Sequence, residues 1–270
     1  MAYLRIIRPV NCFITLISVL VGGWIGQNII FSATLLLAGL IGFVVCAFGN
    51  IVNDIRDIEI DRINNPKRPL ASGALRKKNA LLMAIISFIL AALGSFFLGF
   101  LPIIIVITAL LLLLFYSIYL KKTLAGNLTI AVIAGMSFVL GGLVTGNPVC
   151  IVHVIFSVFI HLPREIVKDV IDMKGDKIIG AVTVPIIAGP FRAYNISALL
   201  LGLLCLVLPL PYVLGILNVA YIIIVLLVAY PLILYIIWRL LRKPSPDELP
   251  VISKLIKASM AIGLIAMIVS

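Results

Sequence analysis

The segment Asn53-Asp54-Ile55-Arg56-Asp57-Ile58-Glu59-Ile60-Asp61 places four acidic side chains within eight positions of a chain that is otherwise strongly apolar. The segment from Glu165 to Asp176 repeats this carboxylate spacing, and together the two segments hold eight of the ten acidic residues. We therefore expect the chemistry of the protein to lie at these two acidic segments.

The rest of the chain has the composition of a membrane protein. Of 270 residues, 63% are hydrophobic and 11% are charged, whereas soluble domains are about half apolar and a quarter charged. Apolar runs of roughly 20 residues recur, each long enough to cross a hydrocarbon core of about 30 Å. These runs do not alternate polar with apolar residues, which excludes barrel strands and favours helices. The sequence therefore predicts an all-α, polytopic integral membrane protein, and membrane topology rather than a nucleic-acid partner explains the net charge of +11.

Nine spans are expected in a bundle around a central cavity, near residues 10–27, 30–50, 79–98, 101–120, 128–146, 148–166, 190–208, 213–238 and 251–269. All 21 Lys and Arg residues lie before the first span, in alternate connections or in the span ends that border those connections, and the short connections near Gln27-Asn28, 99–102, 146–148 and 209–211 carry none. The positive-inside rule then places the N-terminus in the cytoplasm and the C-terminus outside. Both acidic segments lie in long cytoplasmic connections, roughly 51–78 and 167–189.

The two acidic segments also form an internal repeat. Asn50-x3-Asp54-x2-Asp57-x3-Asp61 ends the second expected span, and Glu165-x3-Asp169-x2-Asp172-x3-Asp176 ends the sixth. The matched spacing, four spans apart, predicts one transmembrane domain over 1–270 with two similar halves, roughly 1–125 and 126–270.

The spacing of the carboxylates points to a metal. Positions i, i+3 and i+7 lie on one helix face, so each aspartate triad should point one way despite its mutual repulsion. Sets of oxygen ligands without His or Cys suit a hard cation such as Mg²⁺, which also takes waters and phosphates, and make zinc improbable. A solvated charged loop would account for one such cluster but not for two.

Cations and amides lie beside both clusters, and acids that hold a metal next to groups that hold phosphate oxygens describe a diphosphate site. Topology alone accounts equally well for Arg8 and for the pair Lys121-Lys122. The expected phosphate-binding residues are Arg8, Asn11, Asn50, Asn53, Lys67, Arg68, Lys121, Lys122, Arg164 and Lys168.

A diphosphate at the mouth of an apolar bundle implies a substrate with a charged head and an apolar tail. Loss of the diphosphate would leave an allylic cation, which the rings of Tyr116 and Tyr119 could stabilise. The interfacial aromatic belt explains these two tyrosines at least as well.

His161 could line the cavity, but the expected role is that of a histidine packed in the core. The four cysteines have neither ligand nor redox spacing and are interpreted as buried thiols.

These residues resemble a known family. Asn53-Asp54-x2-Asp57-x3-Asp61 and Asp169-x2-Asp172-x3-Asp176 are similar to the two aspartate-rich motifs of the UbiA-type intramembrane prenyltransferases, and the resemblance covers essentially the whole chain. It implies two Mg²⁺ ions that bridge these residues to a prenyl diphosphate. Asn53 and the six aspartates would be the metal ligands, and the six aspartates the catalytic residues.

Residues 61–73 and 164–186 are further similar to the archaeal digeranylgeranylglyceryl phosphate synthase branch. That resemblance implies a multi-pass protein of the cell membrane with its site on the cytoplasmic side, which transfers a geranylgeranyl group from geranylgeranyl diphosphate to the sn-2 hydroxyl of geranylgeranylglyceryl phosphate. Membrane lipid would be its surroundings, and no protein partner is implied. An aromatic-acceptor prenyltransferase of quinone biosynthesis stays open as an alternative. A divalent-cation transporter fits less well, because no expected span has a charged residue at its centre, and a lipid-binding scaffold leaves the two acid triads unexplained.

Overall fold

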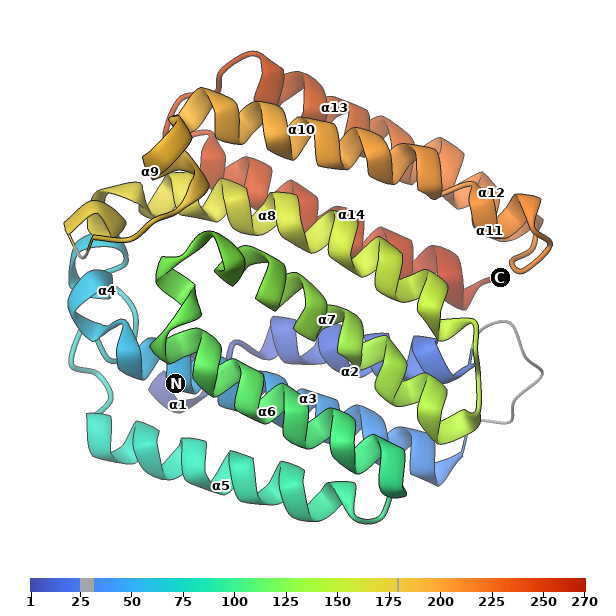
Figure 1. Ribbon diagram of the computed structural model, residues 1–270, viewed down its shortest axis with the longest axis horizontal. Helices are drawn as coiled ribbons and strands as arrows, with labels where there is room; N and C mark the ends of the chain where they lie inside the picture. The colour runs from blue at the N-terminus through green and yellow to red at the C-terminus, as the bar shows by residue number, and fades with distance from the viewer. Residues whose placement is uncertain (25–31, 179) are drawn as a thin grey trace.

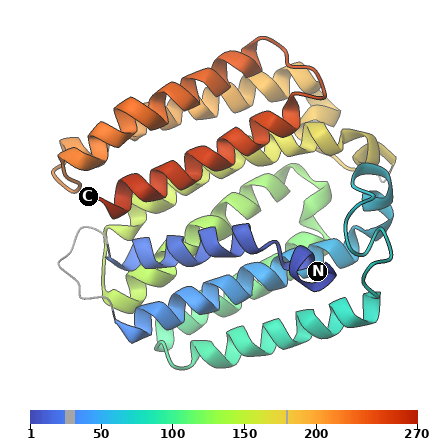
Figure 2. The same ribbon diagram turned by 180° about the vertical axis from the view of Figure 1, so that it is seen from behind.

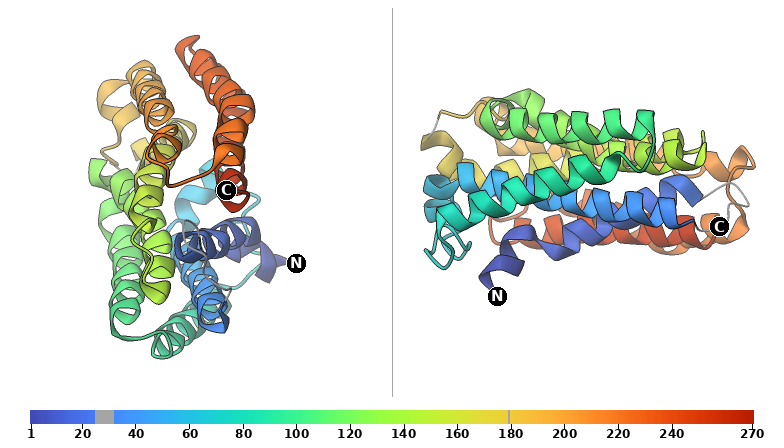
Figure 3. Two further views of the ribbon diagram at one scale, coloured as in Figure 1. Left: turned by 90° about the vertical axis from the view of Figure 1, so that its right-hand side faces the viewer. Right: turned by 90° about the horizontal axis from the view of Figure 1, so that it is seen from below.

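The structure, a computed structural model, describes residues 1–24, 32–178 and 180–270, and all of its regular elements are helical. Figure 1 shows long helices side by side along one direction, and the end view in Figure 3 shows that they pack in more than one layer. The elements are α1 (Ala2–Ile7), α2 (Pro9–Trp24), α3 (Ala33–Arg56), α4 (Ile58–Asn64), α5 (Lys77–Ser95), α6 (Phe100–Ile118), η1 (Leu120–Lys122), α7 (Leu124–Thr145), α8 (Cys150–Ile178), α9 (Val184–Ala188), α10 (Pro190–Val207), α11 (Leu210–Val213), α12 (Val219–Ile224), the π-helical turn η2 (Val225–Ala229), α13 (Tyr230–Leu241) and α14 (Leu249–Ile268).

The helices confirm the polytopic all-α prediction. In the described part of the chain, eight helical stretches are long and apolar enough to cross a membrane, and α2, with 16 residues, is a shorter apolar helix. Together they account for the nine expected spans. The expected end of the first span at 27, the start of the second at 30 and the connection Gln27-Asn28 lie outside the described residues.

Three expected boundaries were wrong. The apolar run near 148–166 ends at the first charges, but α8 continues as one helix to Ile178, so residues 167–178 are not a loop. Likewise α3 continues to Arg56. The expected span 213–238 begins only at Val219, because residues 214–218 form a turn after α11. Charged residues end a hydropathy signal without ending a helix, since a helix that leaves the membrane keeps its own backbone hydrogen bonds.

Lipid-facing surface is clearest on α5. Leu82, Leu90 and Leu93 on this helix are more than half exposed, which water would not favour for so many large apolar side chains on one helix. In Figure 2 α5 lies at the edge of the bundle, away from the C-terminal helices. Figure 1 places α1, α4 and α9 at one end of the bundle and the C-terminus at the other, as an odd number of spans requires. A cytoplasmic N-terminus stays a prediction.

Glycines allow α2 and α7 to touch along their backbones. A Cβ added at Gly22 would lie 2.2 Å from the Phe138 carbonyl oxygen, and one at Gly141 would lie 1.9 Å from that of Val19. Without an apolar driving force between helices in lipid, such close backbone contact is a main source of association. This contact holds α2 of the N-terminal segment closely against α7.

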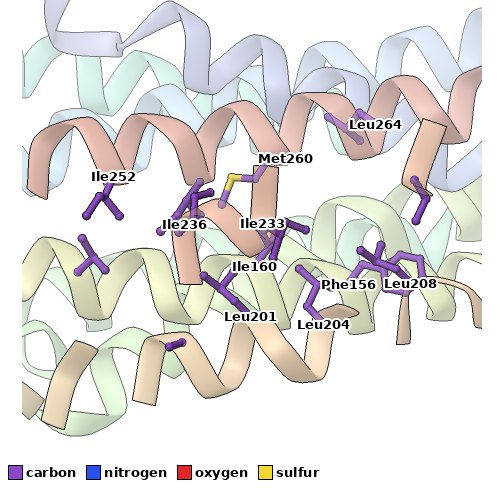
Figure 4. Close-up of a cluster of buried hydrophobic side chains, with 14 of the residues drawn as sticks. Phe156, Ile160, Leu201, Leu204, Leu208, Ile233, Ile236, Ile252, Met260 and Leu264 are labelled. Carbon is purple, nitrogen blue, oxygen red and sulfur yellow. The ribbon is translucent and has the colours of Figure 1, made fainter. Parts of the chain in front are cut away.

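Buried apolar side chains gather in two clusters. One joins α3, α5 and α6, and the other lies between α8, α10, α13 and α14. Figure 4 shows part of the second, in which Ile160, Ile233 and Met260 point toward one another from three helices. The division is broadly one cluster per half of the chain. The proposed sequence repeat between the halves stays a prediction.

Candidate active site

The first acidic cluster lies where α3 passes into α4. Asp54 is in the last turn of α3, Asp57 sits at the break between the helices, and Asp61 is in α4. Their exposed fractions are only 2%, 3% and 4%. Buried carboxylates need compensating partners, so the surroundings of these three side chains determine whether the site can form.

Cations from three distant segments supply that compensation. Arg68 Nη1 donates to Asp61 Oδ2 at 2.8 Å and lies 3.3 Å from Asp54 Oδ1. Arg8 pairs with Asp54, and Lys121 pairs with Asp57. Three buried carboxylates are thus matched by three cations that sequence analysis had placed in the same site. Arg8 and Lys121 are therefore more than topology signals.

A further hydrogen bond and the charges of neighbouring groups act on the first cluster. Asn53 Nδ2 donates to Asp57 Oδ2 at 2.8 Å. Burial raises the pKa of the Asp61 carboxyl to about 6, with Asp57 and Asp54 adding to the shift and Arg68 opposing it. Burial opposes the charge of Arg68, yet Asp54 and Asp61, with Asp172 of the second cluster, raise the pKa of its guanidinium. The cluster is therefore a tightly balanced set of charges.

The second acidic cluster lies on the last three turns of α8. Asp169, Asp172 and Asp176 are half-buried there. Asn127 of α7 donates to Asp169 Oδ2 at 2.6 Å. One turn earlier, the buried Glu165 accepts from Arg164 at 2.7 Å and from Lys168 at 2.6 Å. The end of α8 thus carries the three aspartates, and one turn before them lies Glu165 with its two cationic partners.

The two clusters are held face to face. Asn64 Nδ2, just past the first cluster, donates to the Asp172 carbonyl oxygen at 2.9 Å, and the Gly175 amide donates to Asn64 Oδ1 at 3.1 Å. Asn65 Nδ2 lies 3.5 Å from Asp172 Oδ1, at the limit of a hydrogen bond. A Cβ at Gly175 would lie 2.5 Å from Asn64 Nδ2. Two segments more than a hundred residues apart thus meet at one end of the bundle, as the sequence predicted.

A cavity of about 240 Å³ extends from this region into the bundle. Its polar end is lined by Arg8, Asn11, Asn50, Asn53, Arg164, Glu165, Lys168 and Lys257, and its inner part by apolar side chains of α3, α6 and α7. Asn50 donates to the Ile7 carbonyl oxygen at 2.9 Å, so it also holds the N-terminal segment. Such a cavity suits a molecule with an anionic head and an apolar tail.

The structure brings Tyr116 to the cavity wall but leaves three predicted residues outside. Tyr119 is 62% exposed and packs on Phe115, with ring centroids 5.2 Å apart. Lys67 is exposed. The Lys122 side chain is exposed too, and its carbonyl oxygen accepts from the Val182 amide at 2.7 Å. These three residues do not meet the cluster, although Lys67 and Lys122 were expected to bind phosphate and Tyr119 to stabilise the allylic cation.

Sequence reasoning missed several cavity residues. Lys257 of α14 donates to Asn11 of α2 and lines the polar end, and Asn127 contacts the second cluster. His161, expected to be packed in the core, lines the cavity. The sequence gives no signal for Lys257 and Asn127, because their positions depend on which helices pack together. A signal for His161 did exist, because it lies one helical turn before Glu165.

Residues 15–255 match the UbiA prenyltransferase family. The chain belongs to the UbiA prenyltransferase family. The protein is accordingly a multi-pass membrane prenyltransferase, and the cation-transporter alternative is set aside.

Relatives within the UbiA family are similar over the full length. The digeranylgeranylglyceryl phosphate synthase of Methanothermobacter thermautotrophicus is 38% identical over 98% of this chain and 94% of its own. A solved structure from work on digeranylgeranylglyceryl phosphate synthase is 35% identical, covers 99% of this chain and 96% of its own, and has a TM-score of 0.77. A UbiA homologue from Archaeoglobus fulgidus bound to GPP and Mg²⁺ has a TM-score of 0.69 over 99% of both chains, with 21% identity. This last similarity concerns the fold alone.

Proposed function

We propose that the protein transfers a geranylgeranyl group from geranylgeranyl diphosphate to the sn-2 hydroxyl of geranylgeranylglyceryl phosphate and releases diphosphate. The observation that carries this proposal is the pair of acidic clusters that meet beside the polar end of an apolar cavity, the first of them compensated by three cations. Full-length similarity to digeranylgeranylglyceryl phosphate synthases supports the choice of acceptor. We place the site on the cytoplasmic side, in line with the positive-inside rule.

The donor set fits Mg²⁺. Within residues 1–24, 32–178 and 180–270, no three Asp, Glu, His or Cys side chains converge closely enough to hold a metal by themselves. Mg²⁺ usually takes one or two carboxylates plus waters and phosphates, and both clusters offer carboxylate oxygens for this. Asn53, Asp54, Asp57 and Asp61 on one side and Asp169, Asp172 and Asp176 on the other would hold two ions. Bound Mg²⁺ would neutralise charge on the departing diphosphate.

Side chains of this protein would hold the rest of the donor. Arg8, Arg68 and Lys121 already lie at the first cluster, and guanidinium and ammonium groups bind phosphate oxygens well. Asn11 and Asn50 at the cavity wall offer neutral donors. Lys67, Lys122 and Tyr119 stay peripheral candidates, which would need to move to reach the substrate.

The chemistry is the exchange of one C–O bond for another. The bond between the prenyl C1 and the diphosphate oxygen breaks, and a bond forms from C1 to the acceptor oxygen, whose proton leaves. The face of Tyr116 at the cavity wall would stabilise positive charge on the allyl group. The apolar cavity would keep water from that group. A carboxylate of the second cluster or the departing diphosphate would take the proton.

A product assay by mass tests the proposal. Purified protein with Mg²⁺ and geranylgeranyl diphosphate would be offered geranylgeranylglyceryl phosphate and, separately, aromatic quinone precursors. We expect digeranylgeranylglyceryl phosphate as the product, lost on chelation of the metal and restored by Mg²⁺. Prenylation of the aromatic acceptors alone would contradict the assignment in favour of the quinone branch.

A further inference from the structure

A second cavity of about 70 Å³ lies in the C-terminal half of the bundle, away from both acidic clusters. Its lining comes from α8, α10, η2, α13 and α14 with contributions from α2 and α7, and most of it is apolar. Figure 4 shows several of these side chains, among them Ile160, Leu204 and Leu264, pointing into the space between the helices. We call this space the second arm.

The second arm adjoins the main cavity. Four residues, Ile14, Ser18, His161 and Met260, line both cavities and so form the wall between them. Met260 has a flexible side chain that adapts to neighbouring shapes. His161 lies one turn before Glu165, at the polar end. The two cavities are therefore neighbours, divided by these four side chains.

The two arms are lined mainly by different helices. The apolar part of the main cavity, here the first arm, is lined by α3, α6 and α7, including Val45, Ala109 and Ile133. The second arm is lined mainly by α8, α10, η2, α13 and α14. A transferase with an aromatic acceptor needs one such arm, whereas one that joins two prenylated molecules needs two.

We propose that the second arm binds the prenyl chain of the acceptor, and the first arm that of the donor. This inference rests on the proposed function. Asn53 and Arg8, which contact the first aspartate cluster, line the main cavity together with the walls of the first arm. The second arm instead begins at His161 and Met260, next to Arg164 and Lys257, which would bind the acceptor's phosphate.

Two polar side chains mark the far part of the second arm. His153 and Ser157 line it, are 1% and 4% exposed, and have Nε2 and Oγ atoms without a hydrogen-bond partner among the described residues. His153 lies eight residues before His161 on α8, about 12 Å along the helix axis. Both atoms are already shielded from solvent, so the far part of the second arm is a dry space with an otherwise apolar wall.

Gly263 of α14 offers a clean test. It lines the second arm, and a Cβ there would meet no heavy atom within 4 Å. Gly263→Leu would fill the arm while favouring the helix. Displacing about two methylenes of the acceptor chain should raise the KM for geranylgeranylglyceryl phosphate roughly tenfold. The KM for a geranyl-chain acceptor and that for geranylgeranyl diphosphate should stay unchanged.

Gly202→Leu is the matched control, because Gly202 of α10 is equally open and lines neither cavity. It should leave all three KM values unchanged. An unaltered acceptor KM in Gly263→Leu, or a raised donor KM instead, would overturn the inference. Wild-type protein that makes no product from any glyceryl phosphate would refute the proposed function itself.

A labelling experiment on the wild-type protein avoids dependence on the variant's folding. A geranylgeranylglyceryl phosphate with a photoreactive diazirine at the end of its chain should label peptides of α8, α10 or α14. Labelling confined to α3 or α6 would place the acceptor chain in the first arm and contradict the proposal.

Discussion

Arg68 is the residue on which the first cluster depends most. It is the one described side chain that ion-pairs with two of the buried aspartates, Asp54 and Asp61. Breaking a buried ion pair leaves an uncompensated charge, which costs far more than the intact pair contributes. Because the Arg68 side chain is 24% exposed, solvent softens this cost.

Arg68→Ala should therefore destabilise the protein by roughly 1–3 kcal/mol, the penalty of a buried charged group left without its partner. Thermal unfolding in detergent measures this. Arg62→Ala is the control, since Arg62 pairs only with the exposed Glu59 and should shift stability by no more than about 0.5 kcal/mol. Equal shifts in the two variants would show that Arg68 is not a central partner of the cluster.

Tyr119 does not line the cavity beside Tyr116 as expected, and the reason is geometric. Tyr116 and Tyr119 are three positions apart and would share a helix face. However, α6 ends at Ile118, and Tyr119 has a φ of −121° and a ψ of −49°, so its side chain leaves that face. Lys121 and Lys122 are adjacent in a short 3₁₀ helix and point to different surroundings. Sequence spacing alone does not reveal where a helix ends.

At the scale of elements, the contact between α4 and α8 turns two motifs into one site. Sequence spacing identified both aspartate triads, because few other acids compete with them. It did not reveal that α8 is continuous through the second triad. Nor did it reveal Asn64, whose side chain joins the segments, since that contact depends on how two distant elements pack.

Gly175→Ala tests this contact. Alanine normally favours a helix interior by about 1 kcal/mol over glycine, but here its Cβ would displace Asn64, 2.5 Å away. We expect a lower unfolding temperature and reduced transfer activity. Gly202→Ala, at an open helical position, should be neutral or slightly stabilising. A Gly175→Ala protein as stable and active as wild type would mean that the two helices do not need this close approach.

At the scale of the whole molecule, composition was sufficient to predict a bundle of about nine helices. The periodic charges could identify its polar end as well. A central cavity was expected, but its full lining could not be predicted, because its walls combine helices far apart in sequence, such as α2 with α14 through Asn11 and Lys257. The second arm could not be predicted from the sequence either, because its apolar lining has the same composition as a packed core.

The central claim is that the two aspartate clusters, one from each half of the chain, form a single diphosphate site. Asp57→Asn and Asp172→Asn keep side-chain size but remove one charge from each cluster, and Asp247→Asn, at an exposed position outside both clusters, is the control. The decisive measurement is the rate of geranylgeranyl transfer with saturating Mg²⁺, followed by product mass. Each cluster variant should lose roughly hundredfold or more in rate, as when one group that stabilises the transition state is removed, while Asp247→Asn stays at the wild-type rate. A wild-type rate in either cluster variant would contradict the claim.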